Sequence, residues 1–290
     1  MASQRSGSSF LGELFNRNQD VFYSFEPIRP LTFAVLRGEL DNNQFENEAI
    51  AKLSNTLKCK DVRVYKRTGK SRTDRKLFDL TKACKNKRHV AVKEIRFYKL
   101  DTLRTLAEDP NLNFKIIHLV RDPRAIINSR ENSFFSNHDF KRKRVPWDEV
   151  TDLCKDLQHN LDLITTLPQW LKGKYFLVRY EDLALRPLEA TRDIYNFSGM
   201  PMDEDVEKWV YENTQTEQGG DLSTTRNSTE RVTAWRNELS FSVIADIQNK
   251  CKEPMEMLGY ISLQDQTQQN TLSLPVFTDE TEFFNFPYIL

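Results

Sequence analysis

Three short apolar runs constrain the fold of this chain more than any other feature. They read HVAVKEI at 89–95, FKIIHLV at 114–120 and YFLVR at 175–179, and each consists mostly of apolar residues. Such runs are typical of strands that are covered on both faces of a parallel sheet. Between the last two runs, apolar residues recur with the helical period over 150–164. This alternation predicts an α/β fold in which helices flank a parallel sheet.

The rest of the chain predicts more helices and two polar segments. We expect helices at about 187–198, 203–212 and 241–252, and we expect Pro254 to end or kink the last one. The segment 40–88 is charged and weakly periodic, which favours exposed chain outside the core. Residues 263–290 are rich in Gln, Thr and Asn, which predicts a polar tail that is mostly extended or disordered.

The charge balance excludes some partners. The chain has 42 basic and 42 acidic residues, so no overall field attracts nucleic acid or an anionic membrane. Any anion site must therefore be local. No apolar run is long enough to span a membrane, and the four histidines lack the spacing of metal ligands, so we infer neither a membrane segment nor a metal in this chain. His118 is expected in the core of its strand.

The residues Arg5-Ser6-Gly7-Ser8-Ser9 form the first candidate anion site. They precede apolar residues at helical spacing, which predicts a tight loop that enters an amphipathic helix. The first amides of a helix have no partner within the helix and its dipole is positive there, so the place favours an anion, and Arg5 adds a full charge. A serine N-cap on an ordinary helix explains the same residues.

The second candidate site follows the run 114–120, in LVRDPRAIINSR. Pro123 stands where a helix can begin, so Arg121 and Ser129 flank a strand-to-helix turn. Open α/β sheets bind ligands at this carboxyl edge. The alternative is a surface ion pair between Arg121 and Asp122 beside a solvated helix.

Taken together, RSGSSFLGELF and LVRDPRAIINSR resemble the two phosphosulfate-binding motifs of sulfotransferases that use 3′-phosphoadenosine 5′-phosphosulfate (PAPS). With FYSFEP, VRYEDLALRP and TTRNSTERVTAWR, residues 3–262 resemble the Golgi carbohydrate 6-O-sulfotransferases, which act on galactose, N-acetylgalactosamine or N-acetylglucosamine. The resemblance implies the P-loop-like sulfotransferase fold, with 1–262 as the catalytic domain. It also implies a glycan or glycosaminoglycan acceptor and, in the full-length family, a type II anchor that holds the enzyme in the Golgi lumen.

The resemblance further implies a PAPS site. It assigns Arg5 and the loop backbone to the 5′-phosphosulfate, Arg121 and Ser129 to the 3′-phosphate, and Tyr180 to the adenine. A basic loop that contains Arg226 would close over the nucleotide. The implied donor-binding residues are Arg5, Ser6, Gly7, Ser8, Ser9, Arg121, Ser129, Tyr180 and Arg226.

Sulfuryl transfer also needs a base for the proton of the acceptor hydroxyl. Many cytosolic sulfotransferases place a histidine on a strand that matches HVAVKEIR, but that position is Ile95 here, and the nearby candidates are Lys93 and Arg96. We predict Glu26 as the base, because tyrosyl-protein sulfotransferases have their proposed catalytic glutamate at a like distance from the motif arginine. Nearby cations predict a low pKa for Glu26. The alternative is a structural carboxylate that holds Arg29 or a substrate hydroxyl.

Lys93 is a further candidate in the reaction. It would stabilise charge on the bridging oxygen, as would Arg5 on the leaving group, or it would simply end its strand as a solvated residue. Two other functional classes stay open: a P-loop kinase, although GxxxxGK[ST] is absent, and an inactive binding homologue.

Two structural expectations complete the sequence analysis. If the protein matures in the secretory pathway, we expect disulfides Cys154–Cys251 and Cys59–Cys84, and otherwise four buried thiols. Family members place a strand before RSGSS, but only four residues precede Arg5 here. We therefore expect a chain begun at an internal methionine, with the first strand of the sheet missing or incomplete.

Overall fold

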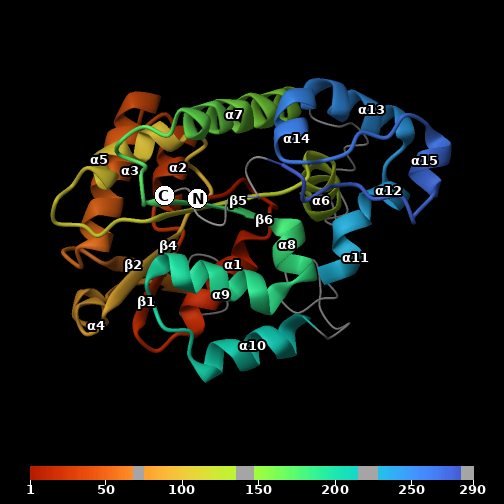
Figure 1. The fold of residues 1–290 in the computed structure, drawn as a ribbon. Helices are drawn as coiled ribbons and strands as arrows, with labels where there is room; N and C mark the ends of the chain where they lie inside the picture. The colour runs from red at the N-terminus through yellow and green to blue at the C-terminus, as the bar shows by residue number, and fades with distance from the viewer. Residues whose placement is uncertain (68–74, 135–146, 215–227, 282–290) are drawn as a thin grey trace. The chain divides into compact units, whose positions relative to one another are not determined.

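The computed structural model describes residues 1–67, 75–134, 147–214 and 228–281 (Figure 1). Two compact units divide the chain: unit 1 contains Met1 and residues 9–114, and unit 2 contains residues 2–8 and 115–290. In both units helices accompany a pair of parallel strands, which confirms the predicted α/β class. No helix in the described parts of the chain is long and apolar enough to cross a membrane.

Unit 1 is built around the parallel pair β1 and β4, in which Val21 lies opposite His89 and Phe25 opposite Lys93. The strand β4 was predicted, whereas β1 was not, because its short sequence VFYSF is broken by Ser24. The elements of unit 1 are α1 (Ser8–Arg17, begun in unit 2), β1 (Val21–Phe25), α2 (Arg29–Leu36), α3 (Asn42–Leu57), β2 (Arg63–Arg67), β3 (Arg75–Asp79), α4 (Thr81–Lys85), β4 (His89–Lys93), the 3-10 helix η1 (Leu100–Leu103) and α5 (Arg104–Ala107).

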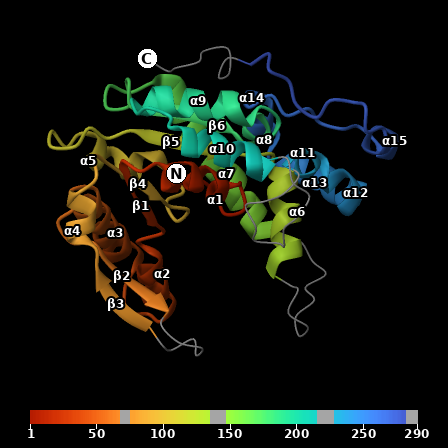
Figure 2. The same ribbon diagram turned by 90° about the horizontal axis from the view of Figure 1, so that it is seen from below.

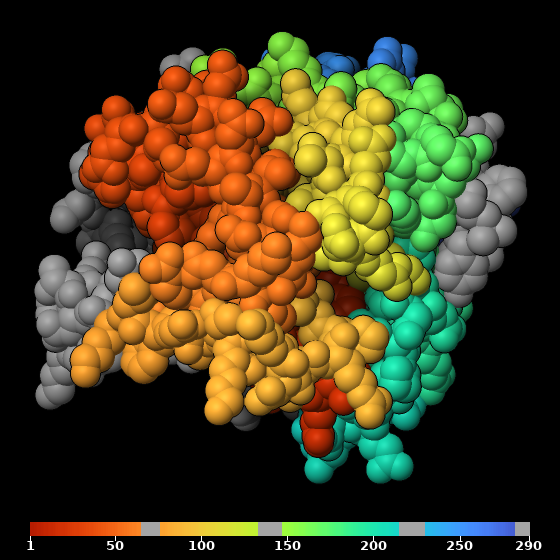
Figure 3. All heavy atoms as spheres, turned by 90° about the vertical axis from the view of Figure 1, so that its left-hand side faces the viewer, coloured from red at the N-terminus to blue at the C-terminus, as the bar shows by residue number. Residues whose placement is uncertain are grey.

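The prediction that 40–88 lies outside the core is wrong for α3 and for the residues around Cys59 and Cys84, while residues 68–74 lie outside the described part of the chain. Helix α3 begins at a capping box, in which the Asp41 side chain accepts from the Gln44 N–H and Gln44 accepts from the Asp41 N–H. Its buried face is a narrow stripe of Ala49, Leu53 and Thr56, which is why the charged sequence concealed it. In Figure 3 the described residues of this segment form much of the orange surface that faces the viewer.

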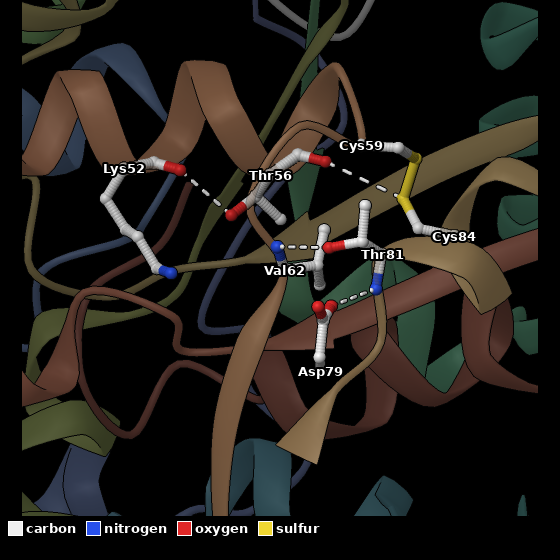
Figure 4. Close-up of a disulfide and its surroundings, with 7 residues drawn as sticks. All are labelled: Lys52, Thr56, Cys59, Val62, Asp79, Thr81 and Cys84. Carbon is white, nitrogen blue, oxygen red and sulfur yellow. Dashed lines mark hydrogen bonds between the residues drawn. A yellow bond between two sulfur atoms is a disulfide. The ribbon is translucent and has the colours of Figure 1, made fainter. Parts of the chain in front are cut away.

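A disulfide completes that core. Cys59 and Cys84 are bonded, with 5.5 Å between their Cα atoms, and they pack with buried Val62 (Figure 4). In the same region the Val62 N–H donates to Thr81 Oγ1 (3.1 Å), and the Thr81 N–H donates to Asp79 (2.9 Å). The disulfide therefore fastens the end of α3 to α4, on either side of the β2–β3 hairpin.

Unit 2 contains the parallel pair β5 and β6, as predicted, and Ala2 makes an isolated parallel bridge to Leu119 of β5. The helices expected at 187–198, 203–212 and 241–252 are confirmed, and the last ends before Cys251, with Pro254 in the first turn of the next. The elements of unit 2 are β5 (Ile116–Val120), α6 (Pro123–Phe134), α7 (Trp147–Thr166), β6 (Tyr175–Arg179), α8 (Tyr180–Leu185), α9 (Pro187–Ser198), α10 (Glu204–Thr214), α11 (Ser228–Thr233), α12 (Trp235–Glu238), α13 (Phe241–Lys250), α14 (Lys252–Met257) and α15 (Gln266–Asn270).

Helix α7 runs beside α14 at the top of Figure 1. The second disulfide, Cys154–Cys251, joins α7 to the residue between α13 and α14, with 4.9 Å between the Cα atoms. Both predicted pairings are thus confirmed, and Cys154 and Cys251 are both buried. The bond ties two helices that are distant in sequence.

The segment after Leu263 differs from the extended or disordered tail that we expected. Residues 263–281 contain α15 and the buried Val276, and their backbone carbonyls accept hydrogen bonds from three buried arginines. Arg236 donates to the carbonyls of Gln269 and Leu274 (3.0 and 2.9 Å). Arg124 donates to the Val276 carbonyl and Arg179 to the Thr278 carbonyl. The segment is held through its backbone, so its polar side chains gave no signal of this packing.

Candidate active site

The loop that leads into α1 has the conformation that an anion site needs. Gly7 has φ 93°, and a Cβ at this position would lie 2.6 Å from Cε2 of Tyr180, so only glycine fits. Arg5 also has a left-handed backbone, with φ 73°. The Ser6 hydroxyl donates to the Ser3 carbonyl (2.7 Å), so Ser6 shapes the loop instead of capping the helix. Ser8 and the exposed Ser9 form the first turn of α1.

Arg121 lies at the centre of unit 2's candidate site. Its Nη1 donates to the Arg5 carbonyl and its Nη2 to the Arg231 carbonyl, both at 2.9 Å. Its guanidinium carbon lies 4.1 Å from the centre of the Tyr180 ring. Arg121 is 7% exposed, and its buried Nε has no hydrogen-bond partner among the described residues. A buried donor of this kind, beside a glycine loop, fits a ligand with anionic oxygens.

The surface ion pair considered for Arg121 and Asp122 is wrong. Asp122 instead binds Arg124, with 2.8 Å between Oδ2 and Nη2, and both side chains are buried. Arg121 instead contacts the loop before α1, through the Arg5 carbonyl. Arg5 reaches the same place, because its Nε donates to Ser129 Oγ (3.0 Å). The structure therefore brings Arg5, Gly7, Arg121, Ser129 and Tyr180 together, whereas Arg226 lies outside the described residues.

Unit 1 carries a second cluster of charged residues, around Glu26. The Glu26 N–H donates to the Lys93 carbonyl (2.9 Å), which sets the two side chains next to each other at the ends of β1 and β4. The Glu26 carboxylate accepts from Lys93 Nζ and from Arg96 Nη1, the latter at 2.9 Å. Glu26 and Lys93 are buried, so the interpretation of Lys93 as a solvated strand end is wrong. The partners of the Glu26 side chain are Lys93 and Arg96, not Arg29 as the structural alternative proposed.

The environment of Glu26 keeps it ionised at neutral pH. Burial raises its pKa, but the hydrogen bonds and charges of Lys93 and Arg96 together outweigh burial and hold the pKa below its ordinary value. Its backbone has φ 46°, in the left-handed region. A buried, ionised carboxylate with two cations is chemically able to accept a proton.

Arg96, a candidate named beside the Ile95 position, extends this cluster to Glu94, which the sequence analysis did not single out. Arg96 Nη1 also donates to Glu94 (3.0 Å), and Glu94 in turn accepts from the N–H groups of Ile28 (3.3 Å) and Ile95 (2.9 Å). Burial raises the pKa of Glu94. The alternating charges of VKEIR were the available sign, but their partners depend on the pairing of β4 with β1.

The histidine on β5 is a core residue, as predicted. His118 is buried, its Nδ1 lies 2.8 Å from the Tyr175 hydroxyl, and burial lowers its pKa to about 3. Because burial disfavours the protonated ring, His118 is a poor candidate for the base. The described residues contain no group of three or more His, Cys, Asp or Glu side chains that could hold a metal ion.

Several known proteins are similar to this chain in sequence. Residues 1–259 match the sulfotransferase domain family. Human carbohydrate sulfotransferase 1 is 35% identical to the chain, over 90% of this chain and 78% of its own length. Carbohydrate sulfotransferase 3 of Tetronarce californica is 34% identical, over 91% and 72%.

A solved structure shows the same fold. The sulfotransferase domain from the curacin biosynthetic pathway superposes with a TM-score of 0.50 and 14% identity, and covers 87% of this chain and 94% of its own. The matches to the domain family and to curated relatives cover most of the chain. The chain therefore belongs to the carbohydrate sulfotransferase family.

Proposed function

We propose that this protein transfers a sulfuryl group from PAPS to a hydroxyl of a hexose or N-acetylhexosamine in a glycan or glycosaminoglycan, at the 6-position. Membership of the family supports sulfuryl transfer to a carbohydrate. The observation that carries the choice of donor is the buried Nε of Arg121 beside the Gly7 loop. Such a site suits a nucleotide with several anionic groups.

The proposed donor contacts follow from the chemistry of each residue. Arg5 and the amides of the loop, with Ser6, Ser8 and Ser9, would hold the 5′-phosphosulfate, because helix-terminal amides and a guanidinium favour anionic oxygens. Arg121 and Ser129 would hold the 3′-phosphate. Tyr180 would lie against the adenine, and Arg226 would approach the nucleotide from the C-terminal basic loop.

Glu26 is the proposed base. Its ionised carboxylate accepts the proton of the acceptor hydroxyl, whose oxygen forms a bond to sulfur while the bond from sulfur to the phosphate oxygen breaks. The electron pair of that bond stays on the phosphate oxygen, where the cations Lys93 and Arg5 would stabilise the added charge. The proton ends on Glu26 and returns to solvent.

The first experiment separates enzyme from binding protein. The chain is incubated with radiolabelled PAPS and desulfated chondroitin, desulfated keratan or N-acetylhexosamine acceptors, with labelled ATP in place of PAPS as the test for a kinase. We expect label transfer from PAPS only. Mapping of the labelled sugar identifies the position, and transfer to a hydroxyl other than the 6-hydroxyl contradicts that part of the proposal.

The second experiment separates donor binding from proton transfer. Glu26→Gln should keep its affinity for adenosine 3′,5′-bisphosphate but lose at least about a hundredfold in turnover, since a base contributes roughly 10²–10⁴-fold. Arg121→Ala should weaken that affinity by about ten- to a hundredfold, because a charge-assisted hydrogen bond contributes roughly 1.5–3 kcal/mol. The matched control is Arg192→Ala, an exposed arginine paired with Glu207. Calorimetry that finds Arg121→Ala unchanged would contradict the donor site.

We also propose that the protein works in the Golgi lumen. Two disulfides fit an oxidising compartment, and the full-length family has a type II membrane anchor. Immunofluorescence of the natural protein with a Golgi marker tests this, and a cytosolic distribution contradicts it.

A further inference from the structure

Helix α2 exposes a stripe of two large apolar side chains and one arginine. None of its eight residues is fully buried. Arg29, Phe33 and Leu36 are spaced i, i+4, i+7, which places them on one face of the helix. Phe33 is 44% exposed and Leu36 76%. Helix α2 lies beside α3 in Figures 1 and 2, so its other face supplies the packing and the stripe faces solvent.

The stripe begins at the turn that carries Glu26. Phe25, the residue before Glu26, is 52% exposed, and its ring centre lies 4.4 Å from Lys93 Nζ. The Glu26 carbonyl accepts from the Arg29 N–H (3.1 Å), so the turn is short. The exposed ring of Phe25 therefore precedes the proposed base in the sequence, and the exposed ring of Phe33 follows it in the second turn of α2.

Arg29 gives this surface its charge. Its guanidinium carbon lies 5.8 Å from the centre of the Phe33 ring. In the described part of the chain it forms no ion pair with an acidic side chain, in contrast to Arg37, which binds Glu39. The charges of Lys93 and Arg96 are offset by Glu26 and Glu94. Arg29 is therefore the cation of this surface that is available to a ligand.

We propose that Phe25, Arg29 and Phe33 form an acceptor surface that binds an anionic glycan. The C–H faces of a pyranose ring are apolar and pack on exposed aromatic rings, while Arg29 pairs with a carboxylate or sulfate on a neighbouring sugar. The combination of two rings with one unpaired cation favours an anionic oligosaccharide over a neutral one. This inference rests on the proposed function, because Glu26 is its proposed base.

Binding of defined oligosaccharides tests the acceptor surface without any transfer reaction. The full chain is titrated by calorimetry with a uronate-containing tetrasaccharide and with its carboxyl-reduced counterpart. We expect the anionic sugar to bind about three- to tenfold more tightly, and Arg29→Gln to remove that preference. Phe33→Ala should weaken the affinity for both sugars about fivefold. Phe33→Tyr should restore both affinities, because tyrosine keeps the aromatic ring.

Arg37→Gln is the matched control, since Arg37 follows the same helix but is paired, and it should leave both affinities unchanged. All variants should bind adenosine 3′,5′-bisphosphate as the unmodified chain does.

Equal affinity of the unmodified chain for the two sugars overturns the inference. So does a result in which Phe33→Ala shifts the gel-filtration volume from dimer to monomer while sugar binding stays the same, because the stripe would then bind a second copy. Absence of sulfuryl transfer with intact sugar binding would reject the proposed function and leave the acceptor surface standing.

Discussion

Arg5 and Glu26 share an unusual backbone. Of the non-glycine residues that the structure describes, only these two, Cys59 and Leu167 have φ in the left-handed region. Such a conformation costs on the order of 1 kcal/mol and persists where the surroundings fix it. Arg5 is fixed by Ser129 and Glu26 by Lys93 and Arg96. Two of the three residues that the sequence analysis assigned to catalysis, Arg5 and Glu26, therefore share this conformation with Cys59 and Leu167, whereas Lys93 does not have it.

The pH dependence of turnover should report on Lys93. A base works in its ionised form, so activity falls as the pH drops through the pKa of Glu26. Lys93→Gln removes one of the two cations that lower this pKa against burial, so the pKa should rise. We expect the acid limb of kcat to move to higher pH by about one unit. Lys87→Gln, at an exposed lysine of unit 1, is the control, and an acid limb that stays in place would argue against Glu26 as the base.

A second buried carboxylate, Glu181, should make the free energy of unfolding decrease as the pH rises. Burial, and then the charge of Asp122, raise the pKa of Glu181 from 4.5 to about 7, while Tyr260 donates a hydrogen bond to it (2.8 Å). Between these two values the folded state binds more protons than the unfolded state. The contribution of Glu181 to the free energy of unfolding therefore falls by about 1.4 kcal/mol per pH unit as the pH rises through this window.

Glu181→Gln should lose this slope. Relative to the unmodified chain, we expect the variant to gain about 2–3 kcal/mol between pH 4.5 and pH 8, because the neutral amide carries no cost of burying a charge. Urea denaturation at pH 5, 6, 7 and 8 measures the difference. Glu189→Gln, on the exposed side of α9, provides the baseline. Parallel curves for the unmodified chain and Glu181→Gln would show that Glu181 does not titrate in this range.

At the scale of the elements, the C-terminal segment 263–281 is held by hydrogen bonds from buried arginines that lie outside it. Arg236 is 1% exposed and donates to the carbonyls of Gln269, Thr271 and Leu274. Arg236→Ala leaves these carbonyls without donors, so we expect a loss of about 3–5 kcal/mol. Hydrogen exchange over 263–281 should accelerate, whereas Arg192→Ala should change neither quantity. Unchanged protection of the segment would show that Val276 and α15 hold it without Arg236.

The elements also show how far the sequence could predict the fold. The strands β5 and β6 and the helix α7 were predictable, because their apolar patterns are long or nearly continuous. The helix α3 was not, since Ala49 and Thr56 supply much of its buried face. At the site, motif spacing led to Arg5, Arg121 and Ser129. Arg96 was named only as a candidate beside Ile95, and Glu94 was not named, because their contacts arise only when β4 pairs with β1.

At the scale of the whole molecule, each unit carries one disulfide. Cys59–Cys84 of unit 1 closes a loop with a sequence separation of 25, and Cys154–Cys251 of unit 2 one of 97. A disulfide stabilises mainly because it restricts the unfolded chain, and the effect grows slowly with loop length. The loop-length relation gives about 3.5 kcal/mol for the first bond and about 4.7 kcal/mol for the second. Both bonds should therefore matter to folding, and the second should matter more.

Paired substitutions to alanine test this prediction, since Cys84 and Cys251 are fully buried and alanine adds no polar group. We expect Cys154→Ala with Cys251→Ala to lose about 3–5 kcal/mol and Cys59→Ala with Cys84→Ala about 2–4 kcal/mol in the free energy of unfolding. Urea denaturation followed by tryptophan fluorescence measures both, in oxidising buffer and with dithiothreitol. The stability of each double variant should respond less to the reductant than that of the unmodified chain. A variant in which all four cysteines are replaced by alanine should not respond to it. If dithiothreitol leaves the unmodified chain as stable as before, the bonds add nothing to its stability and the protein would fold equally well in a reducing compartment.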